Sequence, residues 1–221
     1  MARLARVVLP GYPHHITQRG NRRQDVFFKD EDYLYYLELL KKWCDEERVE
    51  IWSYCLMTNH VHLIVTPVLS SNLSRAIAET HRRYTRMINF RENWRGYLWQ
   101  GRFASFPMDE MYLLKAAAYV ELNPVKAKMV SAPEEYRWSS VHAHLKGKDP
   151  FGVVDPQKLI DICGDWKDYL QRAVADTEDD FVKHSRTGRP LGDDSFLERA
   201  ERLLNRNLRK QKPGPKVKRD N

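Results

Sequence analysis

The 221-residue sequence lacks long apolar runs and contains few cysteines. No run of about eighteen or more apolar residues occurs, so we expect no transmembrane helix. The segment 1–10 has no apolar stretch long enough for a secretory signal. The three cysteines (Cys44, Cys55 and Cys163) are odd in number and widely spaced, which argues against a disulfide framework and against a zinc knuckle. We therefore predict a soluble protein of the reducing cytoplasm that does not interact with membranes.

Acidic residues are too few to balance the basic ones at the C-terminal end. The chain has a net charge of +7, and residues 186–221 contribute eleven basic and five acidic side chains, or +6. Two further arginine clusters lie in segments 1–27 and 70–106, with five Arg against one Asp and seven Arg against two Glu. Such clusters are typical of a protein that binds a polyanion, and nucleic acid is the commonest one. A merely solvated basic surface is the alternative.

Apolar periodicity and turn residues predict an α+β fold in the first 125 or so residues. The expected elements are strands at 14–19, 50–57, 60–66 and 97–106 and helices at 30–47, 70–90 and 111–123. Pro124 is expected to end the last of these helices, because proline lacks the N–H that a continuing helix needs. This order indicates a ferredoxin-like antiparallel sheet with helices packed on one face.

The remainder of the chain is predicted to be a helical C-terminal extension followed by a basic tail. Helical spacing recurs at 133–145, 155–163, 165–174 and 193–209. We divide the chain into a first domain at 1–147, a helical extension at 148–208 and a tail at 209–221. The tail is too charged and too rich in proline to fold unaided, so we expect it to be disordered and to lie along phosphates.

Two histidines lie on one face of the strand predicted at 60–66. Successive strand side chains alternate between faces, so His60 and His62 point the same way and Val61 and Leu63 point the other way. Neutral imidazole is a common ligand of divalent transition metals. The pair therefore indicates half of a metal site, and two solvated histidines on a surface strand are the alternative.

A tyrosine and an amide lie on one face of the helix predicted at 111–123. Lys115, Tyr119 and Asn123 follow one another at i, i+4 spacing. A tyrosine hydroxyl can attack phosphorus when a metal polarises the phosphate, and Asn123 can add an amide oxygen to such a site. These ligands suit Mg²⁺ or Mn²⁺. The alternative is a tyrosine packed in the core, with Lys115 solvated rather than near a nucleophile.

Four motifs in this order resemble a known family. MTNHVHLI at 57–64 and YVELNPVKA at 119–127 are similar to the Y1 transposases of the HUH superfamily, and HHITQRGNR at 14–22 and LWQGRF at 98–103 extend the likeness. The sequence most resembles the REP-associated tyrosine transposases of the IS200/IS605-like group, from about residue 10 to residue 145. Thr58 departs from the pattern, which has proline before Asn-His.

The resemblance implies a ferredoxin-like catalytic domain with a divalent metal held by His60 and His62. Asn123 matches the position of a polar metal ligand on the tyrosine helix. Tyr119 would be the nucleophile that cuts single-stranded DNA beside a hairpin, leaving a 5′-phosphotyrosine and a free 3′-hydroxyl for strand transfer. The protein would act as a monomer or homodimer.

The basic clusters supply the expected contacts to single-stranded or hairpin DNA. The residues that we predict to bind nucleic acid are Arg19, Arg22, Arg23, Arg82, Arg83, Arg86, Arg102, Lys210, Lys212, Lys216 and Lys218. Two other functions fit the same residues. One is a non-catalytic, sequence-specific binder of hairpin or single-stranded DNA. The other is a metal-dependent phosphodiesterase that activates water instead of Tyr119.

Overall fold

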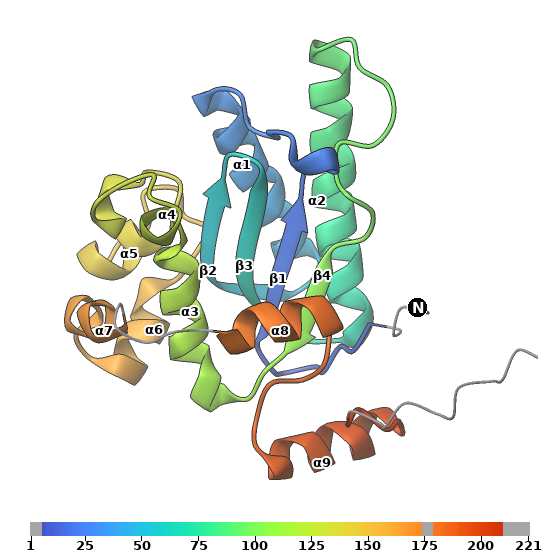
Figure 1. The fold of residues 1–221 in the computed structure, drawn as a ribbon, viewed down its shortest axis with the longest axis vertical. Coiled ribbons are helices and arrows are strands. Elements are labelled where there is room, and N and C mark those ends of the chain that lie inside the picture. The colour runs from blue at the N-terminus through green and yellow to red at the C-terminus, as the bar shows by residue number, and fades with distance from the viewer. Residues whose placement is uncertain (1–5, 174–178, 210–221) are drawn as a thin grey trace, which may run out of the picture.

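A four-stranded antiparallel sheet with two long helices on one face forms the centre of the computed structural model, which describes residues 6–173 and 179–209 (Figure 1). The elements follow one another as β1 (His14–Arg19), α1 (Asp30–Glu46), β2 (Val49–Met57), β3 (His60–Pro67), α2 (Ser70–Arg91) and β4 (Ala104–Pro107). The strand order is β2-β3-β1-β4. This βαββαβ arrangement confirms the predicted α+β, ferredoxin-like class.

Both faces of the sheet are covered by helices. Helices α1 and α2 pack together behind the sheet, as predicted for the two helices of a ferredoxin-like unit. On the other face lie α3 (Leu113–Glu121), which packs on β2 and β3, and α8 (Asp179–Thr187), which packs on β4 and β1. The prediction of helices on one face therefore left out the helices on the second face. Cys55, Ile64 and Phe106 point to that face, and α3 and α8 shield these apolar side chains from water.

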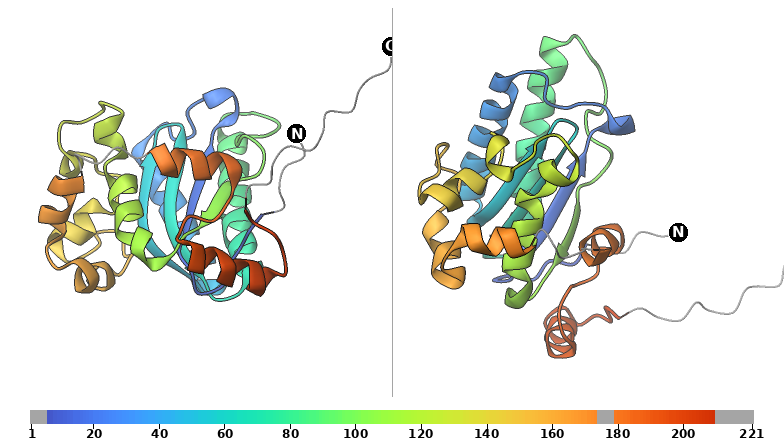
Figure 2. Two further views of the ribbon diagram at one scale, coloured as in Figure 1. Left: turned by 60° about the horizontal axis from the view of Figure 1, so that its bottom comes forward. Right: turned by 60° about the vertical axis from the view of Figure 1, so that its left-hand side comes forward.

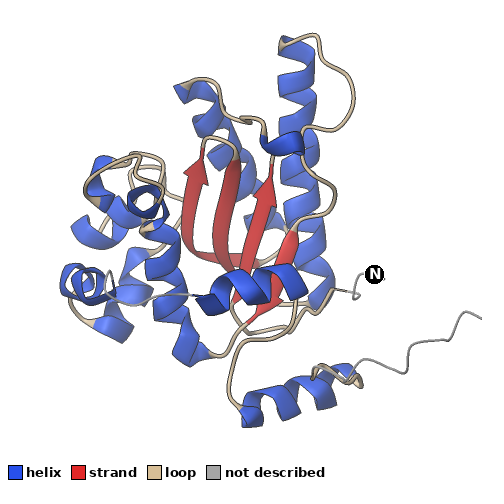
Figure 3. Cartoon of the chain, viewed as in Figure 1, coloured by secondary structure: helices blue, strands red, loops and turns tan. Residues whose placement is uncertain are grey.

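The helical C-terminal extension is confirmed, and Figure 3 shows that the chain beyond β4 contains no further strand in its described part. The helices are α4 (Asn123–Lys126), α5 (Val141–Lys146), α6 (Pro156–Cys163), α7 (Trp166–Ala173) and α9 (Asp194–Leu204), with short 3₁₀ turns η1 (Asn21–Arg23), η2 (Glu110–Tyr112) and η3 (Pro133–Glu135). Among the described residues, no helix is long and apolar enough to cross a membrane.

Several local predictions need correction. The tyrosine helix α3 ends at Glu121, before Pro124 as expected, but Pro124 itself lies in the first turn of a second short helix, α4, where the missing N–H is not needed. The strand predicted at 97–106 is confined to β4, and Trp99 makes only an isolated bridge to Gly20. The helix predicted at 133–145 is reduced to η3 and α5, and α8 was not predicted at all. The tail at 210–221 lies outside the described residues.

Helix α9 packs against the segment that precedes β1. Phe196 and Ala200 of α9 form a small second core with Val7 and Leu9, which precede β1. Phe196 also lies 5.3 Å from the ring of Tyr12, measured between centroids. The extension is thus packed on the N-terminal segment that leads into the sheet.

Buried neutral histidines make the fold sensitive to acid. His81 of α2 is hydrogen-bonded to the Tyr36 hydroxyl at 3.0 Å, and burial lowers its pKa to about 3. Below pH 6.5 the unfolded chain binds a proton at this residue that the folded chain does not, so stability is full above that pH and falls as the pH drops toward 3. We expect His81 to cost about 1.4 kcal/mol between pH 7.5 and 5.5.

Urea unfolding at the two pH values measures this effect. In His81→Gln the difference between the unfolding free energies at pH 7.5 and 5.5 should shrink by about 1.4 kcal/mol, because glutamine does not titrate. If the unfolding free energies of variant and wild type depended on pH in the same way, His81 would be protonated as readily in the folded chain as in the unfolded chain.

Candidate active site

The two histidines of β3 lie side by side on the sheet face that α3 and α8 cover. Their ring centroids are 4.9 Å apart, and the neighbouring strand places Arg19 opposite His60 and Thr17 opposite His62. Burial, followed by the charge of Arg19, lowers the pKa of His60 to about 3. Burial also holds the pKa of His62 well below its ordinary value. Both imidazoles are therefore neutral at pH 7, the state in which they can bind a metal.

Asn59 orients the ring of His60. Its side-chain Nδ2 donates to the Arg23 carbonyl at 3.2 Å, so its Oδ1 is the atom that faces His60 Nδ1, 2.6 Å away. An amide oxygen only accepts hydrogen bonds, so Nδ1 carries the proton and Nε2 keeps a free lone pair. The sequence analysis missed this role, although Asn59 directly precedes His60 in the motif.

His15 of β1 supports His62 in a similar way. The two rings stack 5.2 Å apart, and His15 Nε2 lies 3.0 Å from His62 Nδ1. The proton between them can belong to either ring; when His62 donates it, its own Nε2 is free to bind a metal. His15 is fully buried and was not singled out from the sequence, although its alternation with Thr17 and Arg19 places it on this face.

Tyr119 lies against the histidines of its own chain. Its ring centroid is 5.8 Å from that of His62 and 5.7 Å from that of His15. One turn later, Asn123 Nδ2 donates to the Tyr119 carbonyl at 2.8 Å, which leaves the amide Oδ1 for another partner. Lys115 is exposed on the same helix. The structure thus brings together the predicted tyrosine and histidine pair within a single chain.

The donor atoms that this site offers a metal are few. In the described part of the chain, no group of three or more His, Cys, Asp or Glu side chains could hold a metal. A metal at the histidine pair would have the two imidazole Nε2 atoms and the Asn123 amide oxygen as its candidate protein ligands. Such a set would leave coordination positions for phosphate and water.

Helix α8 covers this site. The Phe181 ring stacks on the Tyr119 ring, with centroids 5.1 Å apart and planes at 20°, and it also contacts His15 and Phe106. Figures 1 and 2 show α8 lying across the sheet on the side opposite α1 and α2. One side of the tyrosine ring is therefore occupied by an aromatic side chain of the C-terminal extension.

Three of the predicted DNA-binding arginines border the site. Arg19 is half-buried at the end of β1; burial lowers its pKa, Arg23 lowers it further, and Tyr119 opposes the shift. Arg22 and Arg23 are exposed in η1, beside the Asn59 turn. Positive charge at this end of the sheet suits a phosphate that approaches the histidines.

The other predicted arginines lie farther along α2 and before β4. Arg82 and Arg83 are paired with Glu79, and Arg83 also lies over the Trp43 ring of α1. Arg86 and Arg102 are exposed. Arg82 is held by Glu79 of its own helix, and Arg83 is held by Glu79 and lies against α1. Lys210, Lys212, Lys216 and Lys218 lie outside the described residues.

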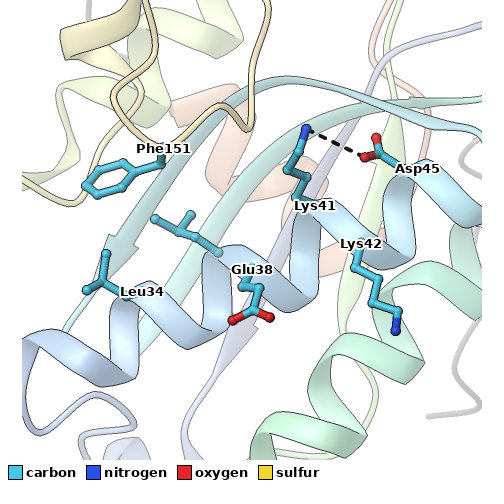
Figure 4. Close-up of a pocket in the computed structure, with 7 residues that line it drawn as sticks. Leu34, Glu38, Lys41, Lys42, Asp45 and Phe151 are labelled. Carbon is cyan, nitrogen blue, oxygen red and sulfur yellow. Dashed lines mark ion pairs between the residues drawn. The ribbon is translucent and has the colours of Figure 1, made fainter.

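A recess of about 380 Å³ lies away from these residues, on α1. Figure 4 shows its lining by apolar Leu34 and Phe151 and by charged side chains, with Lys41 paired to Asp45 at 3.6 Å. None of its lining residues comes from the strands or from α3. The recess is therefore separate from the candidate site at the histidines and Tyr119.

Comparisons with known proteins agree with this arrangement. The family described as "Transposase IS200 like" matches residues 10–123, just over half of the chain. A relative from Haemophilus influenzae with the provisional name REP-associated tyrosine transposase is 27% identical over 119 residues, which are 49% of this chain and 68% of the relative.

A solved structure is also similar. It is described as a REP-associated tyrosine transposase bound to a REP hairpin, and it matches with a TM-score of 0.58 and 21% identity. The match covers 68% of this chain and 90% of the other. At this identity the likeness establishes the shared fold.

Proposed function

The chain belongs to the IS200-like transposase family, and from that premise we propose that it nicks single-stranded DNA and transfers the strand through a covalent bond to Tyr119. The observation that carries the proposal is the contact between the Tyr119 and His62 rings, 5.8 Å apart beside the His60–His62 pair. The residues that we propose as nucleophile and as metal ligands thus lie side by side within one chain. A monomer could therefore complete the site.

Each residue of the site has its own role in the proposed reaction. His60 Nε2, His62 Nε2 and Asn123 Oδ1 would hold Mg²⁺ or Mn²⁺, which when bound polarises the scissile phosphate. The Tyr119 hydroxyl oxygen attacks phosphorus and loses its proton; the 3′-oxygen leaves and takes up a proton. The products are a 5′-phosphotyrosine and a free 3′-hydroxyl, and the reverse reaction joins the phosphate to another strand. We assign the phosphate contact to Arg19, which lies opposite His60 on the neighbouring strand.

We propose hairpin DNA as the substrate. Support comes from the solved structure of similar fold, whose description names a bound REP hairpin. Exposed Arg22 and Arg23 beside the Asn59 turn supply charge for the DNA backbone at the same end of the sheet. The predicted contribution of the basic tail remains a hypothesis.

Covalent capture tests the function. The protein is incubated with Mn²⁺ and a library of labelled hairpin oligonucleotides with single-stranded flanks, and then run on a denaturing gel. We expect a labelled protein–DNA adduct that disappears with EDTA. Cleavage without an adduct would favour the water-activating phosphodiesterase, and binding without cleavage would favour the non-catalytic DNA binder.

Loosening the cover over Tyr119 is expected to speed adduct formation. Phe181→Leu removes the ring stacked on Tyr119 but keeps an apolar side chain against the sheet. Because DNA has to reach the tyrosine past α8, we expect the initial rate of adduct formation to rise about threefold to tenfold, the effect of roughly 1 kcal/mol of lost aromatic contact. Phe196→Leu, in the separate α9 core, is the control. An unchanged rate in Phe181→Leu would show that α8 does not limit access.

A further inference from the structure

The segment between α2 and β4 carries exposed aromatic side chains that neither the core nor the candidate active site uses. Phe90 is 90% exposed and Tyr97 is 87% exposed, and Trp94 between them is 43% exposed. We call residues 90–97 the crossover patch. Large aromatic side chains grouped in this way on a surface mark a binding site more often than scattered single ones do.

The crossover patch is held in an ordered turn. The Trp94 N–H donates to the Asn89 carbonyl at 2.9 Å, and Asn89 Nδ2 donates to the Gly96 carbonyl, also at 2.9 Å. Arg91 at its base is paired with Asp32 of α1. An aromatic surface that is already ordered loses little conformational entropy when it binds a ligand.

The charge around the crossover patch is positive. Residues 82–97 contain five Arg and one Glu. Arg86 and Arg95 are exposed and make no ion pair with any residue that the structure describes. Aromatic rings interleaved with free guanidinium groups are typical of surfaces that stack unpaired bases and bind the phosphates between them.

The crossover patch is continuous with the end of the sheet that holds His60. Just after Tyr97, the Leu98 carbonyl accepts from the Asn21 N–H at 2.7 Å, and the Gln100 N–H donates to the Arg19 carbonyl at 2.8 Å. The Gly20 N–H donates in turn to the Asn59 carbonyl at 2.8 Å. A DNA strand leaving the histidines could therefore run over η1 onto this surface (Figure 1).

We propose that the crossover patch binds unpaired bases of the DNA strand that flanks the hairpin, by stacking on Phe90, Trp94 and Tyr97. The inference rests on the proposed function, because it takes hairpin DNA with a single-stranded flank as the ligand. Backbone charge alone would be satisfied by lysine and arginine. Exposed aromatic rings add a preference for bases that are free to stack.

Three DNA probes test the proposal by fluorescence anisotropy: a blunt hairpin, the same hairpin with a single-stranded extension, and that extension built with abasic sites. The wild type should bind the normal extension most tightly, because only that probe offers bases to stack. In Phe90→Ala/Tyr97→Ala, affinity for this probe should fall about tenfold or more, to that of the abasic one. Affinity for the blunt hairpin should not change. Tyr97→Phe, which keeps the ring, should retain most of the affinity.

Val68→Ala/Leu69→Ala, at exposed apolar positions by the other end of α2, is the matched control and should bind all three probes like the wild type. The proposal would be overturned if Phe90→Ala/Tyr97→Ala still preferred the normal extension as strongly as the wild type does. It would also be overturned if this variant lost as much affinity for the blunt hairpin as for the extended one. Sedimentation showing a dimer that only the aromatic variant disrupts would assign the surface to a second copy of the chain. Adduct formation by the wild type is scored separately, so that failure of the proposed chemistry and failure of the crossover patch can be told apart.

Discussion

Replacement of Tyr119 by phenylalanine is expected to abolish the covalent adduct while leaving the protein folded and bound to DNA. The variant lacks only the hydroxyl oxygen that would attack phosphorus. We expect strand cleavage to fall by a factor on the order of 10⁴ or more, as when other enzymes lose their nucleophile. Denaturing gels with labelled hairpin DNA and Mn²⁺ measure the loss.

Tyr119→Phe should affect cleavage but not DNA binding or stability, because the packing of the ring is kept. Phenylalanine retains the aromatic contacts of Tyr119 with His62, His15 and Phe181. DNA affinity and unfolding free energy should therefore stay close to those of the wild type. Tyr112→Phe, at a half-buried tyrosine before α3, is the control and should cleave normally. If Tyr119→Phe continued to cleave without forming an adduct, water would be the nucleophile and the transposase mechanism would be wrong.

The elements that carry the candidate site were largely predictable because local rules determine them. Alternation along a strand places His60 and His62 on one face, and helical spacing places Asn123 one turn after Tyr119. Neither rule brings the two elements together. That step followed from the resemblance to the Y1 transposases, and the structure confirms that Tyr119 lies beside His62.

Other features could not be predicted because long-range packing determines them. Nothing near Phe181 in the sequence indicates that its ring stacks on one 62 positions earlier. In the sequence Asn59 is only one residue of the motif at 57–64, and its orienting hydrogen bonds to His60 and Arg23 depend on how η1 folds back. The sequence did not indicate that Arg82 and Arg83 both pair with Glu79 or that Arg83 also lies over the Trp43 ring of α1, and their predicted role in DNA binding stays a prediction.

A buried carboxylate on the tyrosine helix is the strongest case of such long-range packing. Glu121 is fully buried two residues after Tyr119. It accepts hydrogen bonds from Ser140 Oγ at 2.5 Å, His144 Nδ1 at 2.6 Å and Trp166 Nε1 at 2.8 Å. A single acidic side chain thus ties α3 to α5 and α7 of the C-terminal half. An interior glutamate in a helix gives no sign in the sequence that these distant donors, and Ser53 Oγ of β2 at 3.3 Å, will surround it.

Glu121→Ala is expected to lower the unfolding free energy by about 3–5 kcal/mol, because it leaves the buried donors of His144 and Trp166 without an acceptor. Glu121→Gln keeps the shape but turns an N–H group toward one of these donors, so its loss should be smaller. Glu134→Ala, at an exposed glutamate beyond α4, should change stability by less than about 0.5 kcal/mol. Urea unfolding followed by tryptophan fluorescence measures all three. A loss below about 1 kcal/mol in Glu121→Ala would show that α5 and α7 dock on α3 without this carboxylate, and that the position of Tyr119 depends on the sheet alone.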